Sequence, residues 1–246
     1  MTDKPLAGRV ALVTGASRGI GAALSLALGR AGAHIIAVAR TVGGLEELDD
    51  ALRTDGATAT LVPLDLKDYA GIDRLGAAIH ERHGRLDVLV GNAGVLGVLS
   101  PLSHVEPKVW EETLFVNLTA NWRLLRAMDP LLLASEAGRA VFLSSGAAAS
   151  ARAYWGPYAV TKAALEVMAR TYAAETSHTA IRVNLVNPGP IRTRLRASAY
   201  PGEDASKLDT PEQVAAEIVP LCLPSCTSSG MLYDYPNRRF ISLQRS

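Results

Sequence analysis

The stretch Val10–Arg30, VALVTGASRGIGAALSLALGR, contains an apolar run, a glycine turn and a helical pattern in direct succession. The run Val10–Val13 is typical of a short buried strand, and Ala22–Arg30 has the composition of a helix. Between them, the glycines at 15, 19 and 21 let backbone amides approach a phosphate closely, and the helix start adds partial positive charge. The stretch therefore predicts a nucleotide phosphate site at a strand-turn-helix unit.

The next apolar run, Ile35–Ala39, bears on which dinucleotide is preferred. Sites for NAD commonly place an acid at the end of this strand for the ribose 2′-hydroxyl, whereas NADP sites place an arginine nearby for the 2′-phosphate. Here Arg40 follows the strand, and Arg18 in the glycine turn is a second cation within reach of the same phosphate. At roughly 1.5 kcal/mol for each charge-assisted hydrogen bond, the pair favours NADP by about 100-fold before solvent screening. We predict NADP(H) as the preferred cofactor without excluding NAD(H); the alternative is that both are ordinary surface arginines.

Apolar runs and helical patterns continue to alternate along the chain. Strands are expected at 58–63, 88–90, 140–143 and 181–186, with helical spacing between them. Such βαβ repeats form a parallel sheet with helices on both faces. We therefore predict the α/β class: a single-domain Rossmann-like, doubly wound parallel sheet of about seven strands over residues 1–246. Residues 192–210 are rich in small residues and predict a lid over a pocket.

Composition excludes several classes of partner. The chain has 246 residues, 48% of them hydrophobic, and a formal net charge of +1, which gives no electrostatic basis for binding nucleic acid or an anionic membrane. No apolar run reaches membrane-spanning length, and no signal peptide is evident at the N-terminus, so a cytoplasmic protein is expected. Cys222 and Cys226 have no histidine near them and are expected to be structural thiols; no metal site is predicted.

Tyr158 and Lys162 lie one helical turn apart in a segment of helical composition, with Pro157 suited to the helix start. An ammonium about 4 Å away, at an effective dielectric near 20, stabilises a phenolate by about 4 kcal/mol. That would bring the phenol pKa from about 10 close to neutrality. Ser145 follows the run 140–143, so its hydroxyl is expected at the carboxyl end of a strand, where α/β sheets bind ligands. The pattern predicts a proton-transfer site, although this Tyr-Lys spacing also occurs by chance on solvated helices.

Two asparagine-containing features precede it. Asn117 lies inside a long helical stretch, 107–133, where Asn is unfavourable because its side chain competes for backbone hydrogen bonds. It is either a tolerated surface residue or a residue that holds water near the site. The turn Asn92-Ala93-Gly94 follows the strand at 88–90, and its small residues would let a nucleotide pack against the backbone.

Together these motifs resemble the classical short-chain dehydrogenase/reductase family, of its NADP-preferring type, from Val10 to about Pro220. The resemblance implies a catalytic tetrad of Asn117, Ser145, Tyr158 and Lys162. It also implies an adenine contact after the third strand and a nicotinamide contact in the turn 188–193. The cofactor-binding residues would be Thr14, Gly15, Ser17, Arg18, Gly19, Ile20, Gly21, Arg40, Asp65, Leu66, Asn92, Ala93, Gly94, Tyr158, Lys162, Pro188, Gly189, Ile191 and Thr193.

The reaction that the resemblance implies is hydride transfer between a nicotinamide cofactor and a carbonyl or alcohol substrate. Tyr158 would donate or accept the proton, and Ser145 would orient the substrate oxygen. Lys162 would bind the nicotinamide ribose, and Asn117 would hold a water that links it to solvent. The pocket positions, mostly apolar, predict a ketone or acyl compound of moderate size. They are Val95, Leu96, Ser145, Ala147, Tyr154, Trp155 and Leu195.

The C-terminal tail, 224–246, departs from the family pattern, because Ser229–Pro236 stands where many relatives have V-D-G-G. Pro236 predicts an edge strand or a wrapping tail. Gly91 replaces a second Asn of many relatives and is expected to be harmless. Since relatives commonly associate through the helices that carry Asn117 and Tyr158, a homodimer or homotetramer is expected. Residues with the spacing for that interface, or equally for the core, are Leu165, Met168, Ala169 and Tyr172.

Two other functions were weighed against the oxidoreductase. A non-catalytic dinucleotide-binding sensor of the same fold would have lost its proton donor or the neighbouring cation, whereas all four polar positions are present. A hydrolase that uses Ser145 would show the G-x-S-x-G pattern around the serine, and this sequence lacks it.

Overall fold

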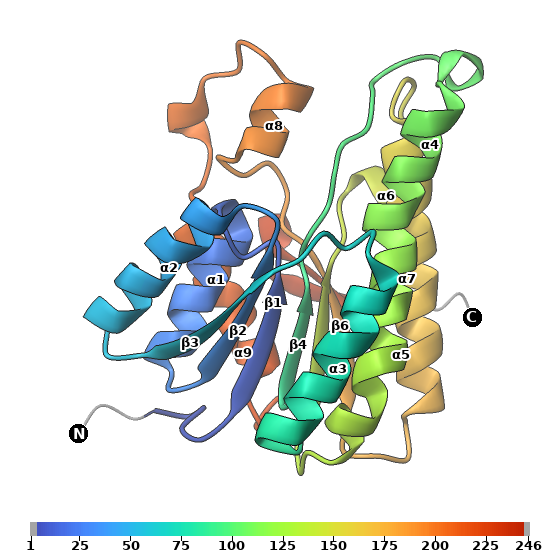
Figure 1. The fold of residues 1–246 in the computed structure, drawn as a ribbon. Coiled ribbons are helices and arrows are strands. Elements are labelled where there is room, and N and C mark those ends of the chain that lie inside the picture. Colours follow the sequence, from blue (N-terminus) through green and yellow to red (C-terminus); the bar gives the residue numbers. More distant parts are fainter. Residues whose placement is uncertain (1–3, 244–246) are drawn as a thin grey trace.

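The computed structural model describes residues 4–243, in which one sheet lies between two layers of helices (Figure 1). The strand order is β3-β2-β1-β4-β5-β6-β7-β8. The strands are β1 (Val10–Thr14), β2 (His34–Ala39), β3 (Thr58–Pro63), β4 (Val88–Gly91), β5 (Arg139–Leu143), β6 (Arg182–Asn187), β7 (Met231–Asp234) and β8 (Arg239–Ser242). The order reverses between β1 and β4, which confirms the predicted doubly wound fold and creates the crevice where such sheets bind ligands.

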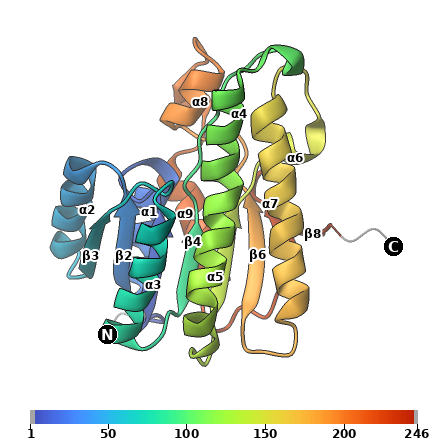
Figure 2. The same cartoon turned by 45° about the vertical axis from the view of Figure 1, so that its right-hand side comes forward.

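Helices cover both faces of the sheet, as Figures 1 and 2 show. On one face lie α1 (Gly19–Arg30), α2 (Val42–Thr54) and α9 (Pro211–Cys222). On the other lie α3 (Tyr69–His83), α5 (Ala120–Leu133) and α7 (Gly156–Glu175), with α4 (Pro107–Leu114) preceding α5. Every residue of β1 is buried, because its alternate side chains enter the two cores. This double burial explains why the strands are apolar without internal alternation.

The C-terminal strand corrects the predicted sheet, which has eight strands rather than about seven and is not wholly parallel. Strand β7 pairs parallel to β6, but β8 pairs antiparallel to β7 and forms the sheet edge. Only the short turn η4 (Tyr235–Asn237) and Arg238, at φ 51°, join the two strands. Because a parallel pair needs a much longer crossover, this connection can make only a hairpin. Of the two alternatives for the tail, the edge strand is thus confirmed.

The stretch 107–133 is not one uninterrupted α-helix. A π-helical segment, η2 (Phe115–Thr119), separates α4 from α5 and contains Asn117. Such segments widen a helix locally and often occur at functional sites, because they redirect side chains and backbone groups. The asparagine that was unfavourable for a regular helix therefore lies at a break in it.

Short helices complete the end of the molecule where the parallel strands finish. They are α6 (Ala147–Ser150), α8 (Arg194–Ala199), and the 3-10 turns η1 (Leu102–His104) and η3 (Ala205–Lys207). In Figure 1, α8 stands above the carboxyl ends of the strands, in the position predicted for a lid. No helix within residues 4–243 has the length and apolar character needed to cross a membrane.

The helix α7 shows which of its apolar residues belong to the core. Leu165, Ala169 and Tyr172 are 0%, 1% and 8% exposed and pack in the same core as α3 and α5. Their helical spacing therefore serves the interior of the chain and not an interface. The two cysteines are free, and Cys222 is buried.

Candidate functional site

A cavity of about 1390 Å³ opens at the carboxyl ends of the parallel strands. Its walls come from the glycine turn after β1, the ends of β2, β4, β5 and β6, and the helix α8. The cavity is larger than a usual small-molecule site of about 300–1,000 Å³. The space therefore fits a dinucleotide together with a substrate.

The glycine turn has a backbone that other residues would not tolerate. Gly15 and Gly19 have φ of 65° and 57°, in the left-handed region that favours glycine. A Cβ added to Gly21 would lie 2.3 Å from the Gly15 carbonyl oxygen, so the turn closes tightly on the start of α1. The geometry leaves the first amides of α1 directed at the cavity, and this is the arrangement that binds phosphate.

Thr14 and Asn92 lie behind this turn and hold it in place. The Thr14 hydroxyl accepts hydrogen bonds from the backbone amides of Asn92 (3.0 Å) and Ala93 (3.1 Å). The Asn92 side-chain amide donates in return to the Thr14 carbonyl at 2.7 Å. The two residues thus join the ends of β1 and β4, and Thr14 itself is completely buried. We predicted both as cofactor contacts; the structure gives their side chains a positioning role.

The remaining predicted cofactor positions largely surround the same cavity. Arg18 and Arg40 are exposed at its mouth, and neither forms an ion pair within residues 4–243. Asp65 accepts from the Lys67 backbone amide at 3.0 Å. The predicted cofactor residues that line the cavity are Gly15, Ser17, Arg18, Gly19, Ile20, Arg40, Asp65, Leu66, Asn92, Ala93, Gly94, Tyr158, Lys162, Pro188, Gly189, Ile191 and Thr193.

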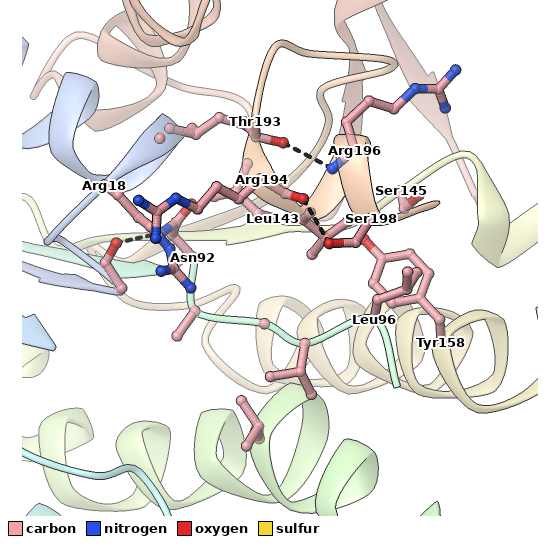
Figure 3. Close-up of a pocket in the computed structure, with 18 of the residues that line it drawn as sticks. Arg18, Asn92, Leu96, Leu143, Ser145, Tyr158, Thr193, Arg194, Arg196 and Ser198 are labelled. Carbon is pink, nitrogen blue, oxygen red and sulfur yellow. Dashed lines mark hydrogen bonds between the residues drawn. The ribbon is translucent and has the colours of Figure 1, made fainter. Parts of the chain in front are cut away.

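The predicted proton-transfer residues come from the end of β5 and from α7. Ser145 follows the end of β5. Tyr158 and Lys162 lie in the first turns of α7, and Pro157 is in the first turn of that helix, as predicted. The three side chains line the same cavity, and the Lys162 Nζ lies 5.7 Å from the centre of the Tyr158 ring. Figure 3 shows Ser145 and Tyr158 at one end of the pocket, beside Leu143. The Lys162 ammonium donates to the Leu143 carbonyl at 2.6 Å.

Burial controls the ionisation of this pair. It raises the pKa of the Tyr158 phenol, against the opposing effect of a hydrogen bond from Ser145. It lowers the pKa of Lys162 to about 8, against the opposing charge of Glu166. The expectation that Lys162 would bring the Tyr158 pKa down towards neutrality is therefore wrong for the protein on its own. The reason is that both groups lie in a poorly solvated interior, and the ammonium is bound to the Leu143 carbonyl.

Asn117 is completely buried in the π-helical segment, and its side chain is fully engaged by the protein. Its Oδ1 accepts from the Val95 amide at 2.8 Å. Its Nδ2 donates to the Val95 carbonyl (2.9 Å) and to the Thr161 hydroxyl (3.0 Å). This clamps the loop after β4 to α7, next to Lys162. The alternative of a tolerated surface residue is thus wrong, because the side chain is buried and joins two segments; that Asn117 holds a water stays a prediction.

The predicted substrate positions divide into two groups. Val95, Leu96, Trp155 and Leu195 line the cavity, as does Ser145. Ala147 is instead buried in α6, and Tyr154 is 59% exposed at φ 73°; the cavity wall includes neither. This division could not be predicted from the sequence, because the direction of each side chain depends on the turn between α6 and α7.

Several residues of this region were not predicted. Tyr200, which follows α8, lies with its ring centre 5.8 Å from that of Trp155. Trp155 in turn packs edge-on against Tyr158, with 6.0 Å between the ring centres. Directly after β5, the Ser144 hydroxyl donates to a Glu166 carboxylate oxygen at 2.5 Å. Glu166 lies one helical turn after Lys162 on α7, and this spacing was the one sequence signal that it lies near the site. Its partner, Ser144, could not be predicted from the sequence.

Comparison with known proteins agrees with this fold and cavity. The sequence profile described as short chain dehydrogenase matches residues 9–204, and the chain belongs to this family. An uncharacterized oxidoreductase of Escherichia coli K12, YciK, is 39% identical over 240 residues, which cover 94% of this chain and 93% of that protein. The 2,3-dihydro-2,3-dihydroxybenzoate dehydrogenase of Bacillus subtilis is 34% identical over 209 residues, or 84% and 79% of the two chains.

Solved structures show the same similarity. A short chain dehydrogenase from Shigella flexneri in complex with NADP superposes with a TM-score of 0.90 at 36% identity, covering 96% of this chain and 100% of that one. One from Escherichia coli CFT073 in complex with NADPH has a TM-score of 0.89 at 36% identity, with coverage of 96% and 99%. The family predicted from the sequence motifs is thereby confirmed.

Proposed function

We propose that the chain is an oxidoreductase that uses NADP(H) to interconvert a carbonyl and an alcohol group of a small-molecule substrate. The observation that carries this proposal is the meeting of Ser145, Tyr158 and Lys162 in the cavity that the glycine turn also lines. The similar structures that hold NADP or NADPH support the choice of cofactor.

The cavity fits such a cofactor. The tight turn at Gly15, Gly19 and Gly21 offers α1 amides to the pyrophosphate. Arg18 and Arg40 would hold the 2′-phosphate, and the turn Pro188–Thr193 would hold the nicotinamide amide. When bound, NADP(H) supplies or accepts the hydride.

The chain's own residues then handle the proton. Because burial raises its pKa, Tyr158 is a protonated phenol at neutral pH and can donate to a substrate oxygen. Ser145 donates a second hydrogen bond that orients the same oxygen. Lys162 places a positive charge 5.7 Å from the phenol ring, which stabilises the phenolate after the proton has left. In the reverse direction the phenolate is the base.

The apolar wall of the cavity limits the substrate class. Val95, Leu96 and Leu195 line it, and Trp155 covers it beside Tyr158. The lid arginine Arg196 is neutralised by Glu203, with hydrogen bonds of 2.6 Å from both Nε and Nη2. We therefore propose an uncharged ketone or acyl compound of moderate size.

The test is a screen of carbonyl compounds with the purified protein, following the loss of reduced-nicotinamide absorbance with NADPH and NADH in parallel. Tyr158→Phe should abolish turnover while NADPH binding, measured by titration, stays nearly unchanged. Turnover that survives this substitution would refute the proton-donor role.

Arg40→Ala tests the cofactor preference. Loss of its contact with the 2′-phosphate should weaken NADPH binding by about tenfold and leave NADH binding close to that of the wild type. An equal effect on both cofactors would mean that Arg40 does not recognise the 2′-phosphate.

We also propose that the chain forms a homodimer or homotetramer through α5 and α7. On these neighbouring helices Trp122, Val160 and Val167 are 46%, 42% and 54% exposed. Exposed apolar side chains that gather on one face favour association. Size measurement in solution at micromolar concentration decides it, and a strict monomer would contradict the proposal.

A further inference from the structure

The lid contains three arginines at every second position, Arg192, Arg194 and Arg196, and their side chains have different contacts. Arg192 donates to the carbonyls of Ala205 (2.9 Å) and Leu208 (3.3 Å), which ties the two ends of the lid together. Arg196 is paired with a carboxylate and stacks over the Tyr200 ring at 3.7 Å. Both guanidinium groups are thus used to build the lid.

Arg194 is the exception. Its side chain is exposed and lines the cavity, and within the described range 4–243 it has no hydrogen bond or ion pair with another side chain. An arginine is always charged, and its planar group matches the geometry of a phosphate or carboxylate. An unpaired arginine that lines the cavity can therefore take up an anion there.

The position of that anion follows from what faces Arg194. A Cβ added to Gly19, the first residue of α1, would lie 3.5 Å from the Thr193 methyl group, so the start of the lid touches the glycine turn. In Figure 3 the Arg194 side chain extends toward Arg18 and Asn92, away from Ser145 and Tyr158. Arg18 also lacks an ion-pair partner among residues 4–243.

Two guanidinium groups directed at one region repel each other unless an anion lies between them. The amides at the start of α1, a helix of 12 residues, already point into this region and favour negative charge. The glycine turn and Arg194 therefore approach the same region of the cavity from two separated parts of the chain, with Arg18 beside them.

We propose that Arg194 binds the pyrophosphate of the dinucleotide from the lid side, so that cofactor binding closes the lid. The inference rests on the proposed function and adds a residue to it. We assign the contact to the pyrophosphate and not to the 2′-phosphate, because Thr193 at the start of the lid lies next to Gly19 in the first turn of α1, whereas Arg40 follows the end of β2. The same contact would fix Thr193 and Leu195 beside the nicotinamide and substrate ends of the cavity.

The test compares Arg194→Met, which keeps the length of the side chain, with Arg194→Lys, which keeps the charge. Arg194→Met should weaken NADPH and NADH by the same factor of about tenfold, the effect of one charge-assisted hydrogen bond. Arg194→Lys should recover most of this loss, and 2′-AMP, which lacks the pyrophosphate, should bind all three proteins equally. Lys207→Ala, which removes a charge from the lid outside the cavity, is the matched control and should bind as the wild type does.

A second readout follows the lid itself. Hydrogen exchange of residues 194–208 should slow when NADPH is added to the wild type and stay fast in Arg194→Met. Unchanged affinities in Arg194→Met, a loss confined to NADPH, or an equal loss in Lys207→Ala would each overturn the inference while leaving the proposed function intact. A wild-type protein that binds neither cofactor would overturn both.

Discussion

Lys162 is a buried cation whose cost to stability can be measured. It is 3% exposed, and burial lowers its pKa from 10.5 to about 8. The unfolded chain binds the proton of Lys162 more tightly than the folded chain does. The lysine therefore lowers the free energy of unfolding at any pH below its folded pKa, and this loss disappears as the pH rises toward its unfolded pKa. One pKa unit corresponds to about 1.4 kcal/mol, so the charged form costs about 3 kcal/mol at pH 7.

Lys162→Met removes this charge and keeps the aliphatic stem. The variant also leaves the Leu143 carbonyl without its 2.6 Å donor, a loss of about 1–2 kcal/mol. The net expectation is that Lys162→Met is about 1–2 kcal/mol more stable than the wild type at pH 7, although it should be inactive. Between pH 7 and pH 9.5 the wild-type lysine loses its proton, so the difference should narrow by about 2 kcal/mol.

Urea unfolding of the ligand-free proteins at pH 7, 8.5 and 9.5 measures the stability difference at pH 7 and its change with pH. Lys207→Met serves as the control, since the Lys207 side chain is 81% exposed and its removal should give a small difference that does not change over this range. A stability difference for Lys162→Met that is constant with pH would refute the reasoning. A variant far less stable than the wild type at pH 7 would do so as well.

Two further substitutions test neighbouring parts of the site. Glu166→Gln keeps an acceptor for Ser144 but removes the negative charge that raises the pKa of Lys162. In this background, the stability difference between the protein with Lys162 and its Lys162→Met variant should therefore become smaller at lower pH than it does with Glu166. An unchanged pH range would show that the Glu166 charge does not act on Lys162. Gly91→Ala would place a Cβ 2.3 Å from Asn121 Oδ1 and 2.4 Å from Phe142 Cδ1, and should cost about 1–3 kcal/mol in urea unfolding. Asn121→Ala in the same chain should recover part of that loss, and an additive effect would contradict the steric explanation.

That Gly91 is a harmless departure from the family pattern stays a prediction, and the geometry shows what the glycine packs against. The residue ends β4 against the buried Asn121 and Phe142, and a larger side chain has no space. Asn121 in turn donates to the Asn117 carbonyl at 2.9 Å, so Gly91 packs against a residue that is bonded to the π-helical segment.

The order of most elements and the glycine turn could be predicted from the amino-acid sequence alone, and the sequence also predicts which residues supply acid-base chemistry. These follow from local rules: strands buried on both faces are apolar without alternation, left-handed turns need glycine, and side chains one turn apart share a helix face. The turn at Gly15 and the pair Tyr158 and Lys162 are examples, since each is defined by neighbours within a few residues.

The surroundings of these residues could be known only from the folded chain. The pKa directions of Tyr158 and Lys162 depend on burial and on the Leu143 carbonyl, which comes from a different strand. The engagement of Asn117 by Val95, the core position of Leu165 and the direction of Arg194 depend likewise on segments distant in sequence. Periodicity carries no information about such distances, or about the solvent around a charge, and these are the quantities that set its ionisation and its partners.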